Sequence, residues 1–255
     1  MIDQLLEQSI KRQVKQDSVA VLLSGGVDSF SVAVSAHRTG KTVRAYTFQL
    51  KDRPNPDSVA AQRISETFGW PIIVCEIPHQ YKWGGVSFPD FHHLCLFVGC
   101  RRKVEFEVCY PFLWMFDALQ DETFILSGWG ADGYYGLSRR ATDPSKGFDV
   151  KNSLKGLNRF RESYFSKNPA CYDQISLMMR QRGKHFIAPY VTDSDIADYF
   201  APKTWQDLND TVQTGGSKQK GLTRLAYKTE IDQVGRLAPQ NNLQKNGITD
   251  LSLKC

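Results

Sequence analysis

Several patterns that would assign this chain to a class at once are missing from its 255 residues. Its six cysteines include no Cys-x-x-Cys pair, which argues against a zinc ribbon or a dithiol redox motif. No apolar run approaches the roughly 18 residues that a membrane-spanning helix needs. The first residues lack the basic and apolar regions of a signal peptide. We therefore expect a cytoplasmic protein with reduced cysteines and no membrane partner.

An excess of one charge is also missing. The chain has 32 Lys and Arg against 27 Asp and Glu, a net charge of +5. This mild positive balance suits an anionic ligand such as a nucleotide, but it supports nucleic-acid binding only weakly. With 41% hydrophobic and 23% charged residues, the composition is that of an ordinary globular protein.

Short apolar runs alternate with helical patterns in the first half of the chain. Strands are expected at 19–23, 43–50, 71–77 and 124–126, and helices at about 4–16, 29–37, 57–68 and 103–119. The third of these helices would be capped by Asp57 and closed by Gly69. Such alternation predicts an α/β fold with a doubly wound, mainly parallel sheet.

The C-terminal half of the chain has a different sequence pattern. Residues 138–156 are polar and contain Gly and Pro, which predicts a loop, and a mainly helical pattern then continues to about 230. We therefore predict one domain over residues 1–255. An α/β core at 17–137 would bind the ligand, and a mainly helical part at 138–255 would complete the site.

The most specific motif lies between the first predicted strand and its helix, and reads Ser24-Gly25-Gly26-Val27-Asp28-Ser29. Two glycines allow a sharp turn that brings backbone N–H groups close to an anion, and the following helix directs its positive end to the same point. The hydroxyls of Ser24 and Ser29 can add donors. Asp28 would repel a phosphate, so its sensible partner is Mg2+. The string lacks the GxxxxGK[ST] pattern of a Walker A loop.

A second string, Ser127-Gly128-Trp129-Gly130-Ala131-Asp132-Gly133, ends the fourth predicted strand. The first string resembles the PP-loop, SGGxDS, of the ATP pyrophosphatases. The second resembles the SGxGxDE motif of the asparagine synthetase and β-lactam synthetase family. Weaker similarities follow in the family's order: Phe48 to Leu50, Pro56-Asp57, Pro111, Pro189 to Val191 with Asp193, Lys220 to Arg224, and Leu237 to Gly247.

The resemblance implies an adenine nucleotide α-hydrolase-like fold that binds ATP and Mg2+. It also implies roles for individual residues. Leu23 and Leu50 would line the adenine pocket, Ser24, Gly25, Gly26, Ser29, Ser127 and Gly128 would contact the nucleotide, Asp28 and Asp132 would hold Mg2+, and Lys245 would lie over the α-phosphate. A flexible ammonium at that position can neutralise the charge that builds during attack at phosphorus. Arg139, shortly after the second motif, is a candidate for binding an anionic substrate.

Two departures from the family pattern concern the second half of the reaction. Trp129 and Gly133 occupy positions where the family often has glutamates, the first of which assists the attacking ammonia. A tryptophan transfers no proton, but it can wall a substrate pocket or stack on a ring. Asparagine synthetases also carry an N-terminal glutaminase domain, for which Ser24 leaves no room. We therefore expect a separate donor of the amine or ammonia.

The sequence thus predicts an ATP-dependent carbon–nitrogen ligase that adenylates a small-molecule carboxylate and releases pyrophosphate, with AMP leaving when the amine attacks. Two alternatives stay open. A PP-loop enzyme that modifies a tRNA or DNA nucleobase would use Trp129 as a stacking platform. A non-catalytic nucleotide-binding protein would explain the missing glutamates.

Overall fold

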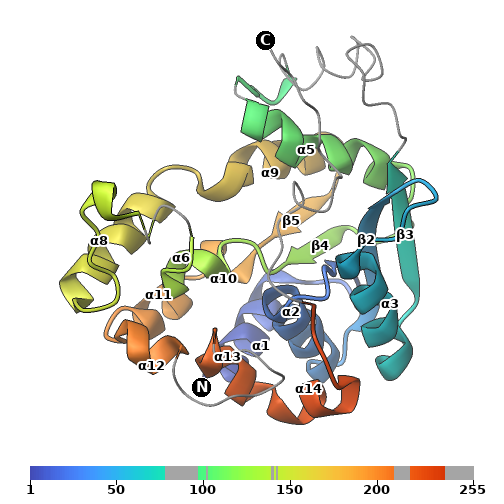
Figure 1. The fold of residues 1–255 in the computed structure, drawn as a ribbon. Coiled ribbons are helices and arrows are strands. Elements are labelled where there is room, and N and C mark those ends of the chain that lie inside the picture. Colours follow the sequence, from blue (N-terminus) through green and yellow to red (C-terminus); the bar gives the residue numbers. More distant parts are fainter. Residues whose placement is uncertain (78–96, 102, 139–140, 142, 210–218, 239–255) are drawn as a thin grey trace.

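The computed structural model describes residues 1–77, 97–101, 103–138, 141, 143–209 and 219–238. Within these residues one sheet runs in the order β3-β2-β1-β4-β5, and every neighbouring pair of strands is parallel. The strands are β1 (Ser18–Leu22), β2 (Thr42–Leu50), β3 (Ile72–Ile77), β4 (Phe124–Ser127) and β5 (His185–Ile187). Helices cover both faces of the sheet (Figure 1), so the predicted doubly wound α/β fold is confirmed.

The helices fall into two groups along the chain. Those of the first half are α1 (Ile2–Gln13), α2 (Val27–Arg38), α3 (Pro56–Phe68), α5 (Lys103–Phe116) and α6 (Ala131–Tyr135). The second half holds α8 (Leu154–Phe165), α9 (Tyr172–Gln181), α10 (Pro189–Thr192), α11 (Ser194–Phe200), α12 (Trp205–Asn209), α13 (Gly221–Ala226), α14 (Lys228–Val234) and the 3-10 turns η1 (Pro144–Lys146) and η2 (Pro169–Cys171). None of the helices in the described part of the chain has the length and apolar character to cross a bilayer.

Successive residues of β1 face opposite sides of the sheet. Val19 and Val21 belong to the apolar core that includes α1, α2 and α3, whereas Ala20 and Leu22 belong to the core beneath α5 and α9. Because both faces of the strand are buried, the sequence shows a continuous apolar run instead of an alternation. This is why β1 could be predicted within one residue of its observed position.

The fifth strand was not predicted, because the C-terminal half was expected to be mainly helical. β5 is only three residues long and ends just before Pro189, so its sequence carries no period that could reveal it. Its pairing with β4 comes from tertiary structure, with Ile125 opposite Phe186. The expected loop at 138–156 also ends earlier, because α8 begins at Leu154.

The cap of α3 lies two residues before the predicted one. Asn55, not Asp57, is the N-cap: its side-chain oxygen accepts the Ser58 N–H at 2.9 Å, and the Ser58 hydroxyl lies 3.0 Å from the Asn55 N–H. Pro56 occupies the first helical position, where its missing N–H has no helical partner to lose. The predicted end of the helix is confirmed, since Gly69 has the left-handed φ of 67°.

The helices of the second half are anchored to α2 by buried hydroxyl groups. Ser31 lies 3.1 Å from the Tyr190 hydroxyl, and Ser35 lies 2.5 Å from the Tyr227 hydroxyl. A buried polar group needs such a partner, so these pairs fix the position of α10 and of the α13–α14 corner on α2. The N-cap of α13, Lys220, is thereby held close to the start of α2.

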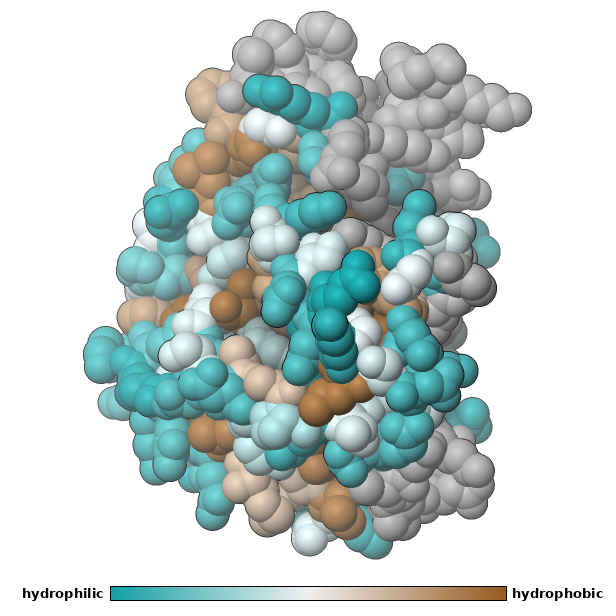
Figure 2. Space-filling view, turned by 90° about the vertical axis from the view of Figure 1, so that its left-hand side faces the viewer, coloured by the Kyte–Doolittle hydropathy of each residue, from teal (hydrophilic) through white to brown (hydrophobic). Residues whose placement is uncertain are grey.

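On the side of α8, the described residues mix hydrophobic and hydrophilic side chains and form no broad apolar patch (Figure 2). Single surface hydrophobics of this kind are normal for a globular protein.

Candidate active site

Both sequence motifs begin at the carboxyl edge of the sheet. β1 and β4 are parallel neighbours, with Leu22 opposite Ser127 at their ends. The chain leaves β1 toward β2 and β3 on one side, whereas β4 leads to β5 on the other. Doubly wound sheets bind their ligands at such a reversal of strand order. Residues 24–29 and 127–133 therefore meet where a ligand is expected.

The first loop is closed by its own hydrogen bonds. The Ser29 hydroxyl accepts the Ser24 N–H at 3.1 Å and donates to the Gly26 carbonyl at 3.1 Å. Gly25 has a φ of 73°, and a Cβ there would overlap the side chain of Ala60. The buried Ser29 thus shapes the loop, while the exposed Ser24 lies at the start of the turn. The loop leads directly into the N-terminus of the 12-residue helix α2.

The second motif packs directly on the first. A Cβ at Gly128 would overlap the peptide between Asp28 and Ser29, so only glycine allows this approach. Gly130, with a φ of 87°, then turns the chain into α6, whose first turn contains Asp132. The close contact of the two backbones brings Asp28 and Asp132 together although they are far apart in sequence.

A buried lysine joins these two carboxylates. The Lys220 Nζ forms an ion pair with Oδ2 of Asp28 and lies 2.5 Å from Oδ1 of Asp132. One oxygen of each carboxylate therefore lies within about 5 Å of the other, roughly twice the length of a charge-assisted hydrogen bond. The Lys220 side chain is 5% exposed, that of Asp28 22% and that of Asp132 40%, so the site opens to solvent on the side of Asp132.

Burial and charge act against each other in this cluster. Burial raises the pKa of Asp28, the Lys220 ammonium lowers it, and Asp132 raises it again, for a net upward shift. Burial also disfavours the charged form of Lys220, but the two carboxylates outweigh it and raise the lysine pKa. Burial lowers the pKa of the neighbouring Arg224, and the charge of Asp28 opposes this. Two carboxylates and two cations thus occupy one partly closed space.

The carboxylates fit a Mg2+ ion that is shared with phosphates. Asp28 Oδ1 is buried and has no hydrogen-bond partner among the described residues, which is the state of an oxygen that a cation could satisfy. No group of three or more His, Cys, Asp and Glu side chains in that part of the chain could hold a metal alone. Mg2+ commonly binds one or two carboxylates and completes its coordination with phosphate oxygens and water.

Comparison with known proteins identifies this architecture. The family model described as asparagine synthase matches residues 1–218. The chain belongs to the asparagine synthase family. It is thus an ATP-utilising synthetase domain of the kind that adenylates its substrate. No curated protein matches the chain. Among solved structures it is similar to "Structure of NMN synthetase from Francisella tularensis", at 15% identity and a TM-score of 0.34, over 94% of this chain and 95% of that chain.

Other residues of the predicted nucleotide site in this asparagine synthase family member lie at the same edge. Leu23 and Leu50 are buried at the carboxyl ends of β1 and β2, and the Leu23 N–H donates to the Tyr46 carbonyl at 2.8 Å. Ser127 is buried at the end of β4, where its hydroxyl accepts the Trp129 N–H at 3.3 Å. Lys245 and Arg139 lie outside the described residues, so their predicted roles stay predictions.

Trp129 packs into an aromatic cluster. Its ring stands edge-on to Phe112 of α5 and Phe186 of β5, each with a ring centroid 6.5 Å away. Its indole N–H donates to the Pro169 carbonyl at 3.3 Å. The ring is only partly buried, so it walls the edge of the site with an apolar surface where a glutamate would offer a charge.

The absence of a side chain at Gly133 also has a structural reason. A Cβ there would overlap the Tyr164 ring and would lie 2.9 Å from the Phe165 ring. Both rings come from α8 and fill the space that a glutamate would need. Burial raises the pKa of the Tyr164 hydroxyl, and the charge of Asp132 adds to the shift, so this phenol stays neutral beside the carboxylate.

Lys220 is a residue of the candidate site that the sequence interpretation did not assign to it. It was noted only as part of a weak family similarity at 220–224. Its left-handed φ of 59° and the hydrogen bond from its N–H to Asn209, at 3.0 Å, fix its backbone. The signal available in the sequence was a lysine followed four residues later by Arg224, and the structure places Lys220 at the N-cap and Arg224 in the last turn of one short helix.

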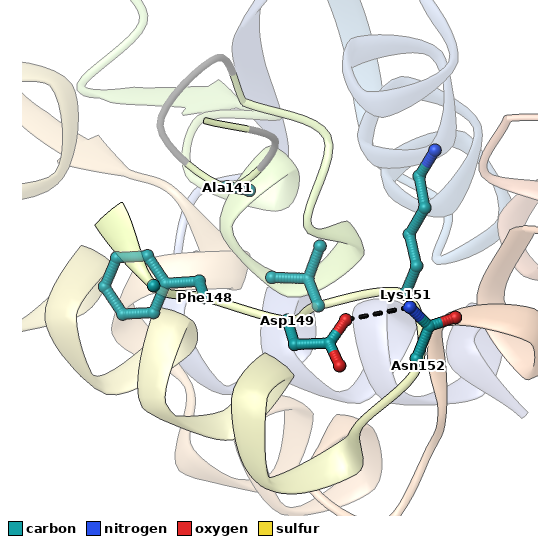
Figure 3. A pocket seen from close by; sticks show the side chains of 7 residues that line it. Ala141, Phe148, Asp149, Lys151 and Asn152 are labelled. Atoms are coloured by element: carbon teal, nitrogen blue, oxygen red, sulfur yellow. Dashed lines mark hydrogen bonds between the residues drawn. The ribbon is translucent and has the colours of Figure 1, made fainter. Parts of the chain in front are cut away.

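A cavity of about 420 Å³ lies away from these residues. It is lined by Ala141 and residues 147–152 (Figure 3). None of the motif residues contributes to its wall, and Asp149 inside it accepts a hydrogen bond from Asn152 at 3.0 Å. The charges that could handle a nucleotide are at the sheet edge instead, so we place the candidate active site there.

Proposed function

We propose that this domain activates a substrate carboxylate with ATP and transfers the acyl group to an amine. A carboxylate oxygen attacks the α-phosphorus of ATP, and the bond to pyrophosphate breaks. The amine nitrogen then attacks the acyl carbon of the mixed anhydride, and AMP leaves. The observation that carries the proposal is the meeting of Asp28, Asp132 and Lys220 beside the N-terminus of α2.

The chain's own groups suit the first half of this reaction. The N-terminus of α2 lies at the site, and a helix N-terminus favours a bound phosphate. Lys220 and Arg224 supply positive charge beside it. Asp28 and Asp132 would hold Mg2+, which neutralises charge on the phosphates when bound. Lys245 remains our candidate for the charge that develops at the α-phosphorus.

The second half of the reaction depends on what replaces the missing glutamates. Trp129 and Gly133 offer no group that accepts a proton. We therefore propose that the amine arrives unprotonated or is deprotonated by a partner, and that a separate protein or solution supplies it. The apolar wall formed by Trp129, Phe112 and Phe186 suits the non-reacting part of the acyl substrate.

A product assay tests the proposal. The domain is incubated with ATP, MgCl2 and a panel of carboxylates, with and without ammonium or amines, and nucleotides are separated by chromatography. We expect carboxylate-dependent AMP and pyrophosphate. Formation of ADP and orthophosphate would refute it. Pyrophosphate release that is stimulated by tRNA or DNA would favour an enzyme that modifies a nucleobase. Tight ATP binding without turnover would favour a non-catalytic role.

Substitution of the paired carboxylates tests the metal assignment. Asp28→Asn and Asp132→Asn keep the side-chain shape but each removes one charge. Losing about 3 kcal/mol of charge stabilisation would lower Mg-ATP turnover on the order of 100-fold. The matched control is Asp17→Asn, since Asp17 is fully exposed and outside the site. Wild-type turnover of either site variant at limiting Mg2+ would exclude a shared metal.

A further inference from the structure

The Lys220 ammonium lies where a cation shared by Asp28 and Asp132 would lie. It contacts Oδ2 of the first carboxylate and is 2.5 Å from Oδ1 of the second. Mg2+ binds its oxygen ligands at about 2.1 Å. A dication bridging the same two oxygens would therefore overlap the ammonium and be strongly repelled by it. Lysine and metal exclude each other at this point.

We propose that Lys220 is a resident counter-ion that closes the metal position until the phosphates of ATP draw its ammonium away. The inference rests on the proposed nucleotide site. Before the nucleotide binds, the lysine neutralises the carboxylates and metal alone is excluded. When phosphates enter, the ammonium moves to them and the two carboxylates become free to hold the metal. Nucleotide and metal then each strengthen the binding of the other.

The structure separates a fixed backbone from a side chain that can move. The Lys220 N–H is held by the buried Asn209 at 3.0 Å, which fixes the start of α13. The ammonium is carried by a flexible four-carbon stem, so it can change partners without moving the helix. The half-exposed Asp132 marks the side from which phosphates would arrive.

The surroundings of Asp28 explain why the Lys220 ammonium would be replaced by a metal ion and would not simply leave the carboxylate without a cation. Its Oδ2 pairs with Lys220, whereas its buried Oδ1 has no hydrogen-bond partner among the described residues. A buried carboxylate without any cation is costly. The ion pair satisfies one oxygen in the nucleotide-free protein, and a metal would satisfy the second oxygen as well.

Metal binding by the intact domain tests this inference without measuring activity. Mn2+ affinity is measured by electron paramagnetic resonance with MnCl2 alone and with a non-hydrolysable ATP analogue. The proteins are wild type, Lys220→Gln and Lys228→Gln. The last is the matched control, because Lys228 pairs with Asp232 on the surface, where both side chains are about half exposed.

We expect Lys220→Gln to bind Mn2+ alone at least about tenfold more tightly than wild type, since a unit charge beside the metal position is removed. The control should match wild type. With the analogue bound, Lys220→Gln should bind Mn2+ no more tightly than wild type, or more weakly, because the wild-type Lys220 ammonium then contacts the phosphates. The inference would be overturned if Lys220→Gln increased the Mn2+ affinity equally with and without the analogue, or did not increase it at all.

Lys220→Arg provides a second test that keeps the charge if the neutral variant does not fold. A guanidinium fork can hold both carboxylates in a bidentate manner and releases them less readily. We expect Mn2+ alone to bind as poorly as to wild type, and Mn2+ with the analogue to bind more weakly than to wild type. Wild-type behaviour with the analogue would contradict the exchange. Failure of wild type to bind the analogue at all would instead remove the proposed function.

Discussion

Replacing Gly128 with alanine tests whether the two motifs must touch. A Cβ at this position lies 2.5 Å from the Ser29 nitrogen and 2.6 Å from the Asp28 carbonyl oxygen. Ordinary contacts of a carbon atom are about 3.5 Å, so one backbone must retreat by roughly 1 Å. Overpacking of this kind costs about 1–3 kcal/mol. In a chain of this size each kcal/mol lowers Tm by roughly 2–4 °C, so we expect a decrease of about 2–12 °C.

The same displacement should weaken the site. A shift of about 1 Å in groups that position a substrate can lower the rate on the order of 100-fold. Thermal unfolding by circular dichroism and binding of an ATP analogue by calorimetry measure the two effects. Gly26→Ala is the control for stability, because its φ is −79° and its Cβ would lie 3.5 Å from the Ser24 hydroxyl. Wild-type Tm and nucleotide affinity in Gly128→Ala would refute the reasoning.

Three further changes address the surroundings of the site. Arg161→Met should lower the free energy of unfolding on the order of 3 kcal/mol in urea, because the carbonyls of Tyr134 and Lys203 lose their guanidinium donor and that of Ala201 loses one of two donors. Gly133→Ala should lower Tm by several degrees, and Tyr164→Leu in the same chain should restore part of the loss, because the clash is with that ring. Burial raises the pKa of Asp193, but hydrogen bonds from Ser9 and Arg12 bring it below the ordinary value of about 3.9. Its stabilisation is present above that value and lost as pH falls through the folded pKa, so Asp193→Asn should flatten the fall of the urea midpoint below about pH 4.

The sequence reveals the core of the fold because β1, β2 and β4 are buried over most of their length, and the partly exposed edge strand β3 is still mainly apolar. Their apolar runs are local signals, and the two glycine-bearing strings mark the ends of β1 and β4. Parallel strands present their carboxyl ends at one edge, so the meeting of Asp28 and Asp132 follows from order along the chain. The Mg2+ ion at that edge is still a prediction.

Other features of the site depend on contacts that have no local signal. Lys220 is 192 positions from Asp28, and only the packing of α13 against α2 brings them together. The three-residue β5 supplies Phe186, one of the rings against Trp129. A short strand and a left-handed lysine cannot be read from periodicity, because each is imposed by residues far away in sequence.

At the two positions where the family resemblance leads one to expect glutamates, other side chains occupy the space that a glutamate would need. Tyr164 and Phe165 from α8 fill the position beside Gly133. Around Trp129, the rings of Phe112 and Phe186 and a hydrogen bond to Pro169 hold the indole in place. A glutamate introduced alone at either position would meet aromatic rings and bury a charge among them. The charged half of the site, which we propose binds phosphates, and the apolar half are therefore built from different elements. The first is formed by α2, α6 and α13, and the second by α5, α8 and β5. Such a division would allow the apolar side, which we propose faces the acyl substrate, to change while the charged side stays the same.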